Sequence, residues 1–226
     1  MTLITNKYIY RQLKRVEVDG KRRYDWGGGL PVPSVTTILD ATKDKTHIIE
    51  WRKRVGETKA TQITVEAAGR GTRMHKYLEI YIDTGTWPTP GSNPYAAQAH
   101  HMATLVKDNA LIHVNEIWGS EVPLYVPQIY AGTTDLVGVY KNQPCIMDFK
   151  QTNKPKKKEW IEDYYLQLTA YALAHNEIHD TDIKEGHVFM CSQDGQYQQF
   201  DLWPDEFEFW KEKWWARVYQ YYENYA

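Results

Sequence analysis

Alternating apolar and polar positions mark the first part of the chain. Residues 8–18, YIYRQLKRVEV, alternate as a half-buried strand does, an Asp-Gly turn follows, and residues 22–26 form a return strand. This pattern predicts an N-terminal β-hairpin segment over about residues 1–33, ending in the extended connector GGGLPVP. The next run, SVTTIL, fits two interpretations, because Ser34 can cap a helix while the β-branched residues also suit a strand.

Helical spacing takes over after residue 46. Residues 47–67 predict a polar helix, which we expect the glycines of GRGT, residues 69–72, to interrupt. Residues 73–85 then predict an amphipathic helix. Its apolar stripe contains Met74, Leu78, Tyr81 and Ile82. After the loop TWPTPGSNP, residues 95–113 are again predicted to be helical.

Residues rich in β-branched and aromatic side chains predict a sheet in the second half of the chain. The expected strands lie near 121–126, 129–140 and 144–150, and the last two are joined by a turn at KNQP. A predicted helix over 159–177 precedes a second hairpin around QDGQ. A closing helix over 204–224 begins after Pro204.

This order of elements predicts one α/β or α+β domain over residues 1–226, with a small mixed sheet flanked by helices. The length is enough for one sizeable core. The chain has nine Trp and seventeen Tyr, and many of them crowd the last quarter of the sequence. We favour their burial in a core over a surface on which bases stack, because so aromatic a helix must cover most of its face.

Charge and cysteine content exclude several classes of protein. The net charge of −2 excludes a surface coated in basic charge, so contact with nucleic acid requires a local patch. Cys145 and Cys191 are too few for a disulfide framework or for an iron–sulfur cluster. The N-terminus lacks a signal-peptide pattern and no apolar stretch is long enough to span a bilayer. We therefore expect a cytoplasmic protein with no membrane partner.

The stretch IMDFK carries charge in an otherwise apolar strand. Because residues two apart share a face, Asp148 and Lys150 point one way while Met147 and Phe149 point the other way, into apolar packing. A desolvated carboxylate needs a partner. A divalent cation shared with a second acid explains a buried Asp148 better than Lys150 alone does.

The preceding strand offers that second acid, Asp135, in the segment AGTTDLVGVY. If KNQP joins the two strands, Asp135 and Asp148 lie on neighbouring strands and can converge on Mg²⁺ or Mn²⁺ through oxygen ligands. Glu121, at the start of the earlier strand, is positioned to join them. The alternative is that these acids are exposed or edge residues of the sheet that bind no metal. The coincidence of Asp135 and Asp148 with Lys150 on the same face as Asp148 disfavours it.

Four short motifs in order resemble the PD-(D/E)XK nuclease superfamily in its RecB-like branch. They are Gly71-Thr72-x-x-His75, Gly132-x-x-Asp135, Asp148-Phe149-Lys150 and Gln167-x-x-x-Tyr171. The upstream YDWGGGLPVPSVTTIL resembles the lead-in of mitochondrial and phage exonucleases of this branch. Two departures are a threonine, Thr134, in place of the proline of the family name, and the absence of the four cluster cysteines of some relatives.

The resemblance implies a restriction-endonuclease-like core and a role for each matching residue. Asp135 and Asp148 would hold Mg²⁺, His75 would complete the metal shell, and Lys150 would orient the attacking water or offset charge on the phosphate. Gln167 and Tyr171 would complete the catalytic set by hydrogen bonding to the lysine, the water or a DNA phosphate. Glu79, one turn after His75, fits a place in the metal site and an exposed position on the helix equally well.

Basic residues beside these motifs predict contact with phosphates. The residues are Arg70, Arg73, Lys154, Lys156, Lys157 and Lys158. A solvated loop is the usual explanation of a lysine run, but positive charge next to a phosphodiester site also concentrates the substrate. Tyr164 and Trp160 are candidates for stacking on bases.

Taken together, these features predict a metal-dependent DNA exonuclease that acts on single-stranded DNA or on free DNA ends. The resemblance implies a part in phage or bacterial-type replication or recombination, and so the host cytoplasm for a phage-encoded protein. Two alternatives stay open: a structure-specific endonuclease of the same superfamily, and a catalytically silent nucleic-acid-binding module. The sequence indicates no oligomeric state.

Overall fold

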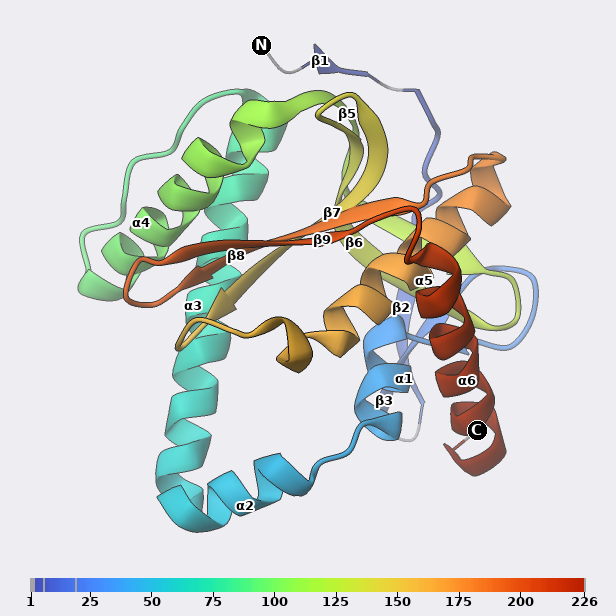
Figure 1. Cartoon of the computed structure of the whole chain (residues 1–226), viewed down its shortest axis with the longest axis horizontal. Helices are drawn as coiled ribbons and strands as arrows, with labels where there is room; N and C mark the ends of the chain where they lie inside the picture. The colour runs from blue at the N-terminus through green and yellow to red at the C-terminus, as the bar shows by residue number, and fades with distance from the viewer. Residues whose placement is uncertain (1–2, 6, 19, 226) are drawn as a thin grey trace.

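A six-stranded mixed sheet with helices on both faces forms the body of the molecule, and a three-stranded sheet lies beside it (Figure 1). This arrangement, a computed structural model, describes residues 3–5, 7–18 and 20–225. The predicted α+β class is confirmed. The parts of the predicted hairpin segment and its turn that fall on residues 1–2, 6 and 19 lie outside the described residues.

The elements follow one another along the chain in the order expected for an α+β fold. The strands are β1 Leu3–Ile4, β2 Lys14–Val18, β3 Lys21–Asp25, β4 Val32–Pro33, β5 Val114–Val126, β6 Tyr130–Tyr140, β7 Gln143–Thr152, β8 Glu185–Ser192 and β9 Tyr197–Leu202. The α-helices are α1 Val35–Thr42, α2 Thr46–Val55, α3 Glu57–Thr84, α4 Pro94–Asn109, α5 Glu162–His179 and α6 Phe207–Tyr225. Short 3₁₀ turns occupy Leu111–His113 and Lys158–Trp160.

The large sheet has the strand order β1-β5-β6-β7-β8-β9. β5, β6 and β7 form an antiparallel meander, and Lys141 and Asn142 make the predicted turn between β6 and β7 with positive φ angles of 47° and 69°. β7 and β8 are parallel, since α5 crosses over between them. β8 and β9 form the predicted second hairpin.

The sheet is buried on both faces, so its strands are more uniformly apolar than a one-sided sheet requires. Alternate residues of β6 and β7 enter two separate cores: Leu136 and Met147 pack under α3 and α4, whereas Val137 and Ile146 pack under α1, α5 and α6. The predicted stripe of α3 is confirmed, with Met74, Leu78 and Ile82 buried and Tyr81 packed partly buried beside them.

The predicted interruption at residues 69–72 is wrong, because α3 runs through them without a break. The chain breaks instead at Gly56, whose φ of 88° a side chain would disfavour. Gly71 has a different function: a Cβ there would lie 3.1 Å from Cγ of Gln151 on β7. Its missing side chain lets α3 approach the sheet closely, for a helix cost of about 1 kcal/mol.

The N-terminal part of the chain is only partly the predicted hairpin. β2 and β3 pair as expected, but residues 8–13 form no strand, because Tyr8 and Tyr10 pack on the ring of His175 in α5 instead. β1 joins the large sheet beside β5. The helical interpretation of Ser34 is confirmed, since its hydroxyl accepts the Thr37 amide hydrogen at the start of α1.

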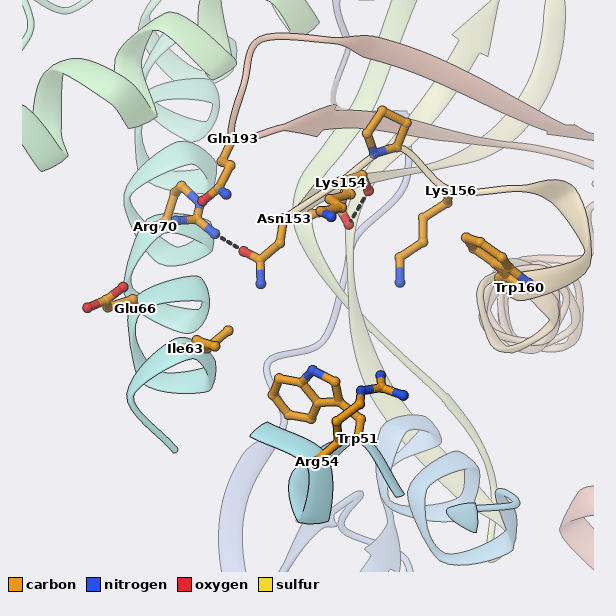
Figure 2. Close-up of a pocket in the computed structure, with 12 residues that line it drawn as sticks. Trp51, Arg54, Ile63, Glu66, Arg70, Asn153, Lys154, Lys156, Trp160 and Gln193 are labelled. Carbon is orange, nitrogen blue, oxygen red and sulfur yellow. Dashed lines mark hydrogen bonds between the residues drawn. The ribbon is translucent and has the colours of Figure 1, made fainter. Parts of the chain in front are cut away.

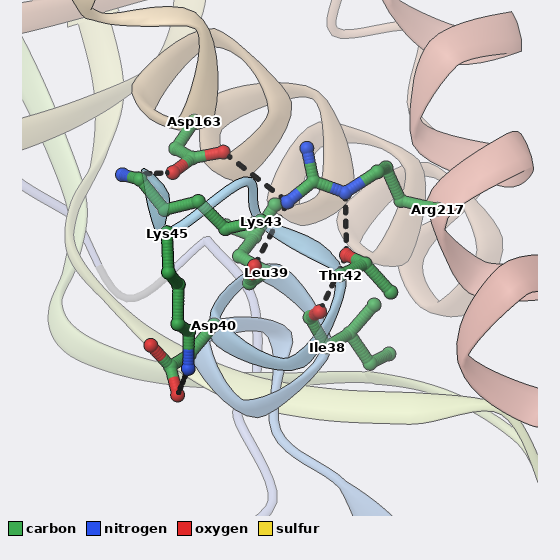
Figure 3. A network of polar contacts seen from close by, with 8 residues as sticks. All are labelled: Ile38, Leu39, Asp40, Thr42, Lys43, Lys45, Asp163 and Arg217. Atoms are coloured by element: carbon green, nitrogen blue, oxygen red, sulfur yellow. Dashed lines mark hydrogen bonds and ion pairs between the residues drawn. The ribbon is translucent and has the colours of Figure 1, made fainter. Parts of the chain in front are cut away.

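Arg217 of α6 ties α1 to α5 and α6 (Figure 3). Its guanidinium donates to the carbonyl of Leu39 at 2.8 Å and to the hydroxyl of Thr42, and it lies 3.4 Å from the carboxylate of Asp163. A cation at these last carbonyls also complements the helix dipole of α1. The aromatic face of α6 is core, as favoured from the sequence, with Trp210, Trp214 and Tyr221 buried.

α2 is exceptional because none of its side chains is buried. It lies at the lower edge of the molecule in Figure 1, between α1 and α3 and away from the large sheet. Among the described residues, no helix is long and apolar enough to cross a membrane.

A buried histidine links β8 to β9 at the edge of the sheet. His187 is 1% exposed, its Nδ1 lies 2.7 Å from Oδ1 of Asp201, and its Nε2 lies 3.2 Å from Oε1 of Glu185. Burial opposes the imidazolium, but the bonds to Asp201, Cys145 and Glu185 outweigh it and raise the pKa of His187 to about 11.

We therefore expect the free energy of unfolding to fall between about pH 7 and pH 10, by up to about 1.4 kcal/mol per pH unit from this residue. The folded state keeps the proton that the unfolded state releases above about pH 6.5, so rising pH favours unfolding. Urea denaturation across this range checks it. His187→Gln should lose this slope and the exposed control His47→Gln should keep it; identical slopes in all three proteins would contradict a charged His187.

Candidate active site

The backbone ladder between β6 and β7 ends at the pair Leu136 and Met147, one residue before two aspartates. Asp135 precedes Leu136 on β6 and Asp148 follows Met147 on β7, so the two predicted acids lie on neighbouring strands, as expected. Oδ2 of Asp135 accepts the Phe149 amide hydrogen at 2.7 Å, which replaces a ladder hydrogen bond by a side-chain one. The sheet thus opens where the two carboxylates enter it.

Asp148 and Lys150 form a buried ion pair on one face of β7. Asp148 is 3% exposed, and its Oδ2 contacts Nζ of Lys150 without the alignment of a hydrogen bond. Burial raises the pKa of Asp148 to about 6, against the attraction of Lys150. Burial opposes the charge on Lys150, but Asp148 and Asp135 outweigh it and raise its pKa. The ring of Tyr164 covers the ammonium, 5.4 Å from Nζ.

His75 reaches the same place from α3. Its Nδ1 lies 3.3 Å from Oδ1 of Asp135, and its ring meets Phe149 edge-on. Burial opposes the imidazolium of His75, yet the neighbouring Asp135 carboxylate outweighs it and raises the pKa. For Asp135 burial opposes ionisation, but His75, Lys150 and the Phe149 amide outweigh it and lower the pKa.

Glu121 faces Asp135 across the β5–β6 ladder, between the pairs Ser120–Leu136 and Val122–Thr134. Its φ of 49° is left-handed, a conformation that costs a non-glycine residue free energy and that often marks a functional site. Desolvation and the nearby Asp135 raise the pKa of its carboxyl to about 7.

Three of the four predicted metal ligands form one group, since one ligand atom each of His75, Glu121 and Asp135 lie within 4.8 Å of one another. Asp148 lies outside this group, on the adjoining strand β7, where it pairs with Lys150 of the same strand. Desolvation is the main cause of the raised carboxyl pKa values at Glu121 and Asp148, and repulsion from Asp135 adds to it, so a cation would favour the ionised carboxylates. One imidazole and several carboxylates suit Mn²⁺ or Mg²⁺, so the residues present fit a divalent ion.

Gln167 and Tyr171 lie together on α5, with the Gln167 amide 3.5 Å from the Tyr171 hydroxyl. Both are buried, and burial raises the pKa of Tyr171. A Cβ at Gly132 would lie 2.8 Å from the Tyr171 ring, so this glycine lets the ring pack onto β6. Among the described contacts neither side chain bonds Lys150, and their expected hydrogen bond to the lysine is therefore absent from this arrangement.

The predicted phosphate-binding residues divide into two sets. Arg70, Lys154 and Lys156 line a cavity of about 650 Å³ between α2, α3 and residues 152–160, which we call the basic cavity (Figure 2). Its other lining residues are Trp51, Arg54, Ile63, Glu66, Thr152, Asn153, Pro155, Trp160 and Gln193.

The second set of predicted phosphate contacts lies outside the lining of this cavity. Arg73 is exposed on α3, Lys157 lies 4.0 Å from Glu159, and Lys158 pairs with Glu206 at 3.4 Å. Sequence analysis missed Trp51 and Arg54 of α2. The run Trp51-Arg-Lys-Arg54, an aromatic beside three cations, is the signal that could have found them.

No protein-family model matches the sequence. The chain is similar to mitochondrial genome maintenance exonuclease 1 of Xenopus tropicalis, with 26% identity over 212 residues, 84% of this chain and 57% of the relative. The protein of the same name from Homo sapiens is also 26% identical over 212 residues, 85% of this chain and 59% of the relative. The chain spans about three fifths of the length of these curated relatives.

A solved structure, the crystal structure of SSO0001, covers 79% of this chain and 74% of its own, with a TM-score of 0.36 and 11% identity. That likeness is too low to bear on the fold or on the site.

We expect Mn²⁺ to raise the melting temperature of the protein by several degrees, because a bound ion stabilises the folded state by mass action and relieves repulsion between acids. Thermal denaturation with and without the ion measures this. Asp135→Asn and Glu121→Gln should lose most of the shift, whereas Glu208→Gln, an exposed change on α6, should retain it. An unchanged melting temperature of the unaltered protein at saturating Mn²⁺ would count against the metal group.

Proposed function

We propose that this chain is a metal-dependent deoxyribonuclease of the RecB-like PD-(D/E)XK branch, acting as one domain over residues 1–226. Its proposed reaction is the hydrolysis of phosphodiester bonds from the ends of single-stranded DNA. The observation that carries this proposal is the buried Asp148–Lys150 pair beside the group of His75, Glu121 and Asp135. Similarity to proteins named as exonucleases supports it independently.

A divalent ion bound there would polarise the phosphoryl oxygen and lower the pKa of a bound water. His75, Asp135 and Glu121 would hold it. Asp148, which pairs with Lys150 outside this group, would complete the shell from β7 by turning a carboxylate oxygen to the ion. Lys150, an ammonium whose pKa is raised chiefly by the two aspartates against the effect of burial, stays charged and would offset the negative charge that develops on the phosphate.

The residues around Lys150 have a positioning role in this proposal. Tyr164 covers the ammonium and so limits the directions in which it can donate. This contact favours orientation of Lys150 over base stacking as the role of Tyr164. Gln167 and Tyr171 follow Tyr164 by one and two turns of α5, and the Gln167 amide would donate to the attacking water or to a phosphate.

Asp148→Ala should lower the rate of DNA cleavage with Mg²⁺ by about a hundredfold or more, because it removes a ligand and the partner of Lys150. Binding of single-stranded DNA should persist. Cleavage of an end-labelled oligonucleotide measures the first and fluorescence anisotropy the second. Circular dichroism confirms folding, and Asp182→Asn, at an exposed acid, is the control. An unchanged cleavage rate would refute the role of Asp148.

Linear single-stranded DNA should be digested while a closed circle of the same sequence stays intact, because the proposed activity needs an end. A 5′-labelled and a 3′-labelled substrate followed over time then report the direction. Cutting of the circle would replace the exonuclease by an endonuclease. Failure to cut any DNA while Mn²⁺ demonstrably binds would overturn the enzyme proposal.

A further inference from the structure

The basic cavity has an unbalanced charge. Its lining contains four cations, Arg54, Arg70, Lys154 and Lys156, and a single carboxylate, Glu66. Within the part of the chain that the structure describes, none of the four cations lies within ion-pair distance of a carboxylate. The protein as a whole carries a net charge of −2, so this cavity is a local concentration of positive charge.

Arg70 is the most telling of these cations because it is only 8% exposed. Its Nε donates to Oε1 of Gln151 at 2.9 Å, and a terminal nitrogen donates to Oδ1 of Asn153. Both acceptors are neutral, and the carboxylate of Glu66, one turn earlier on α3, attracts the guanidinium from beyond ion-pair distance, so its charge is only partly compensated. A buried charge without a counter-ion is costly, and an anion in the cavity would compensate it.

Two indole rings line the same cavity from different elements, Trp51 from α2 and Trp160 from the 3₁₀ turn before α5 (Figure 2). Trp160 is 59% exposed and Trp51 belongs to a helix without buried side chains, so packing of the core does not account for either. Aromatic faces beside cations are the combination that binds single-stranded nucleic acid, by stacking on bases and neutralising phosphates.

The cavity lies a short distance from the proposed cleavage site. Arg70 precedes His75 by five residues on α3, about 7.5 Å along the helix axis. On β7, Thr152 follows Lys150 by two residues, about 7 Å. About one or two nucleotides of an unstacked strand span such a separation, since the rise is about 3.4 Å per nucleotide even in a stacked strand.

Resting on the function proposed above, we propose that the basic cavity is a nucleotide subsite one or two positions from the cleaved phosphodiester. Arg70, Lys154 and Lys156 neutralise its phosphate, while Trp51 and Trp160 contact its base. The cavity volume of about 650 Å³ lies within the range of about 300–1,000 Å³ typical of ligand sites. Because stacking is indifferent to base identity, the subsite requires a base and not a sequence.

An abasic scan tests this subsite. A single abasic residue is moved one position at a time along an end-labelled oligothymidylate, and digestion by the unaltered protein is followed on a sequencing gel. Digestion should pause at a fixed offset of about one or two nucleotides from the abasic residue. The double variant Trp51→Ala with Trp160→Ala should lose this pause and raise KM by roughly tenfold to a hundredfold, with a smaller change in kcat.

The chain offers a matched control for the cations. Arg54 and Lys156 line the cavity, whereas Lys53, the neighbour of Arg54 on α2, does not. Arg54→Ala and Lys156→Ala should each weaken binding and each flatten the slope of log affinity against log salt by about 0.7. Lys53→Ala should leave that slope nearly unchanged.

The outcomes separate this inference from the proposed function. Digestion without an offset pause, or equal effects of lining and control variants, overturns the subsite and leaves the nuclease intact. If the unaltered protein digests nothing, the proposed function fails. The subsite is then tested by anisotropy of a labelled hexathymidylate: weaker binding by Arg54→Ala than by Lys53→Ala supports it, and equal binding overturns it.

Discussion

The burial of charge where β6 and β7 separate is the constraint on which the rest of the structure depends. Asp148 is removed from water on β7, its partner Lys150 is partly buried, and Asp135 is partly buried beside His75. Each charge is tolerable only while the others stay in place, because removing one partner leaves an uncompensated charge in a low-dielectric interior. The two-sided packing of the sheet supplies that rigidity, with Ile146 in one core and Met147 in the other.

Two glycines allow close packing that positions the helices α3 and α5 against the sheet. Gly71 lets α3 lie against Gln151 of β7. Along this helix His75 then lies beside Asp135, and Arg70 lines the basic cavity. Gly132 admits the ring of Tyr171 onto β6 in a comparable way. The group of His75, Glu121 and Asp135 and the basic cavity are therefore connected through α3 and β7.

Patterns of short range predicted much of this arrangement. β-Branched and aromatic content located β6 and β7, the turn at KNQP paired them, and Asp135 and Asp148 were therefore expected on adjacent strands, as found. The break at GRGT was wrong, since the packing of α3 on β7 outweighs the weak helix propensity of Gly71. The sequence also could not predict that Lys154 and Lys156 line the cavity while Lys158 pairs with Glu206, because these contacts depend on distant segments of the chain.

The sequence by itself determined the order of the elements, the two faces of β7 and the residue types able to hold a divalent ion, because these follow from spacing along one segment. Only the tertiary structure decided that Glu121 turns toward Asp135 through a left-handed backbone, that Asp148 pairs with Lys150 outside the three-residue group, and that Trp51 of α2 shares a cavity with Arg70. The physical reason is that burial and charge pairing depend on contacts between segments far apart in the chain, which no local pattern encodes.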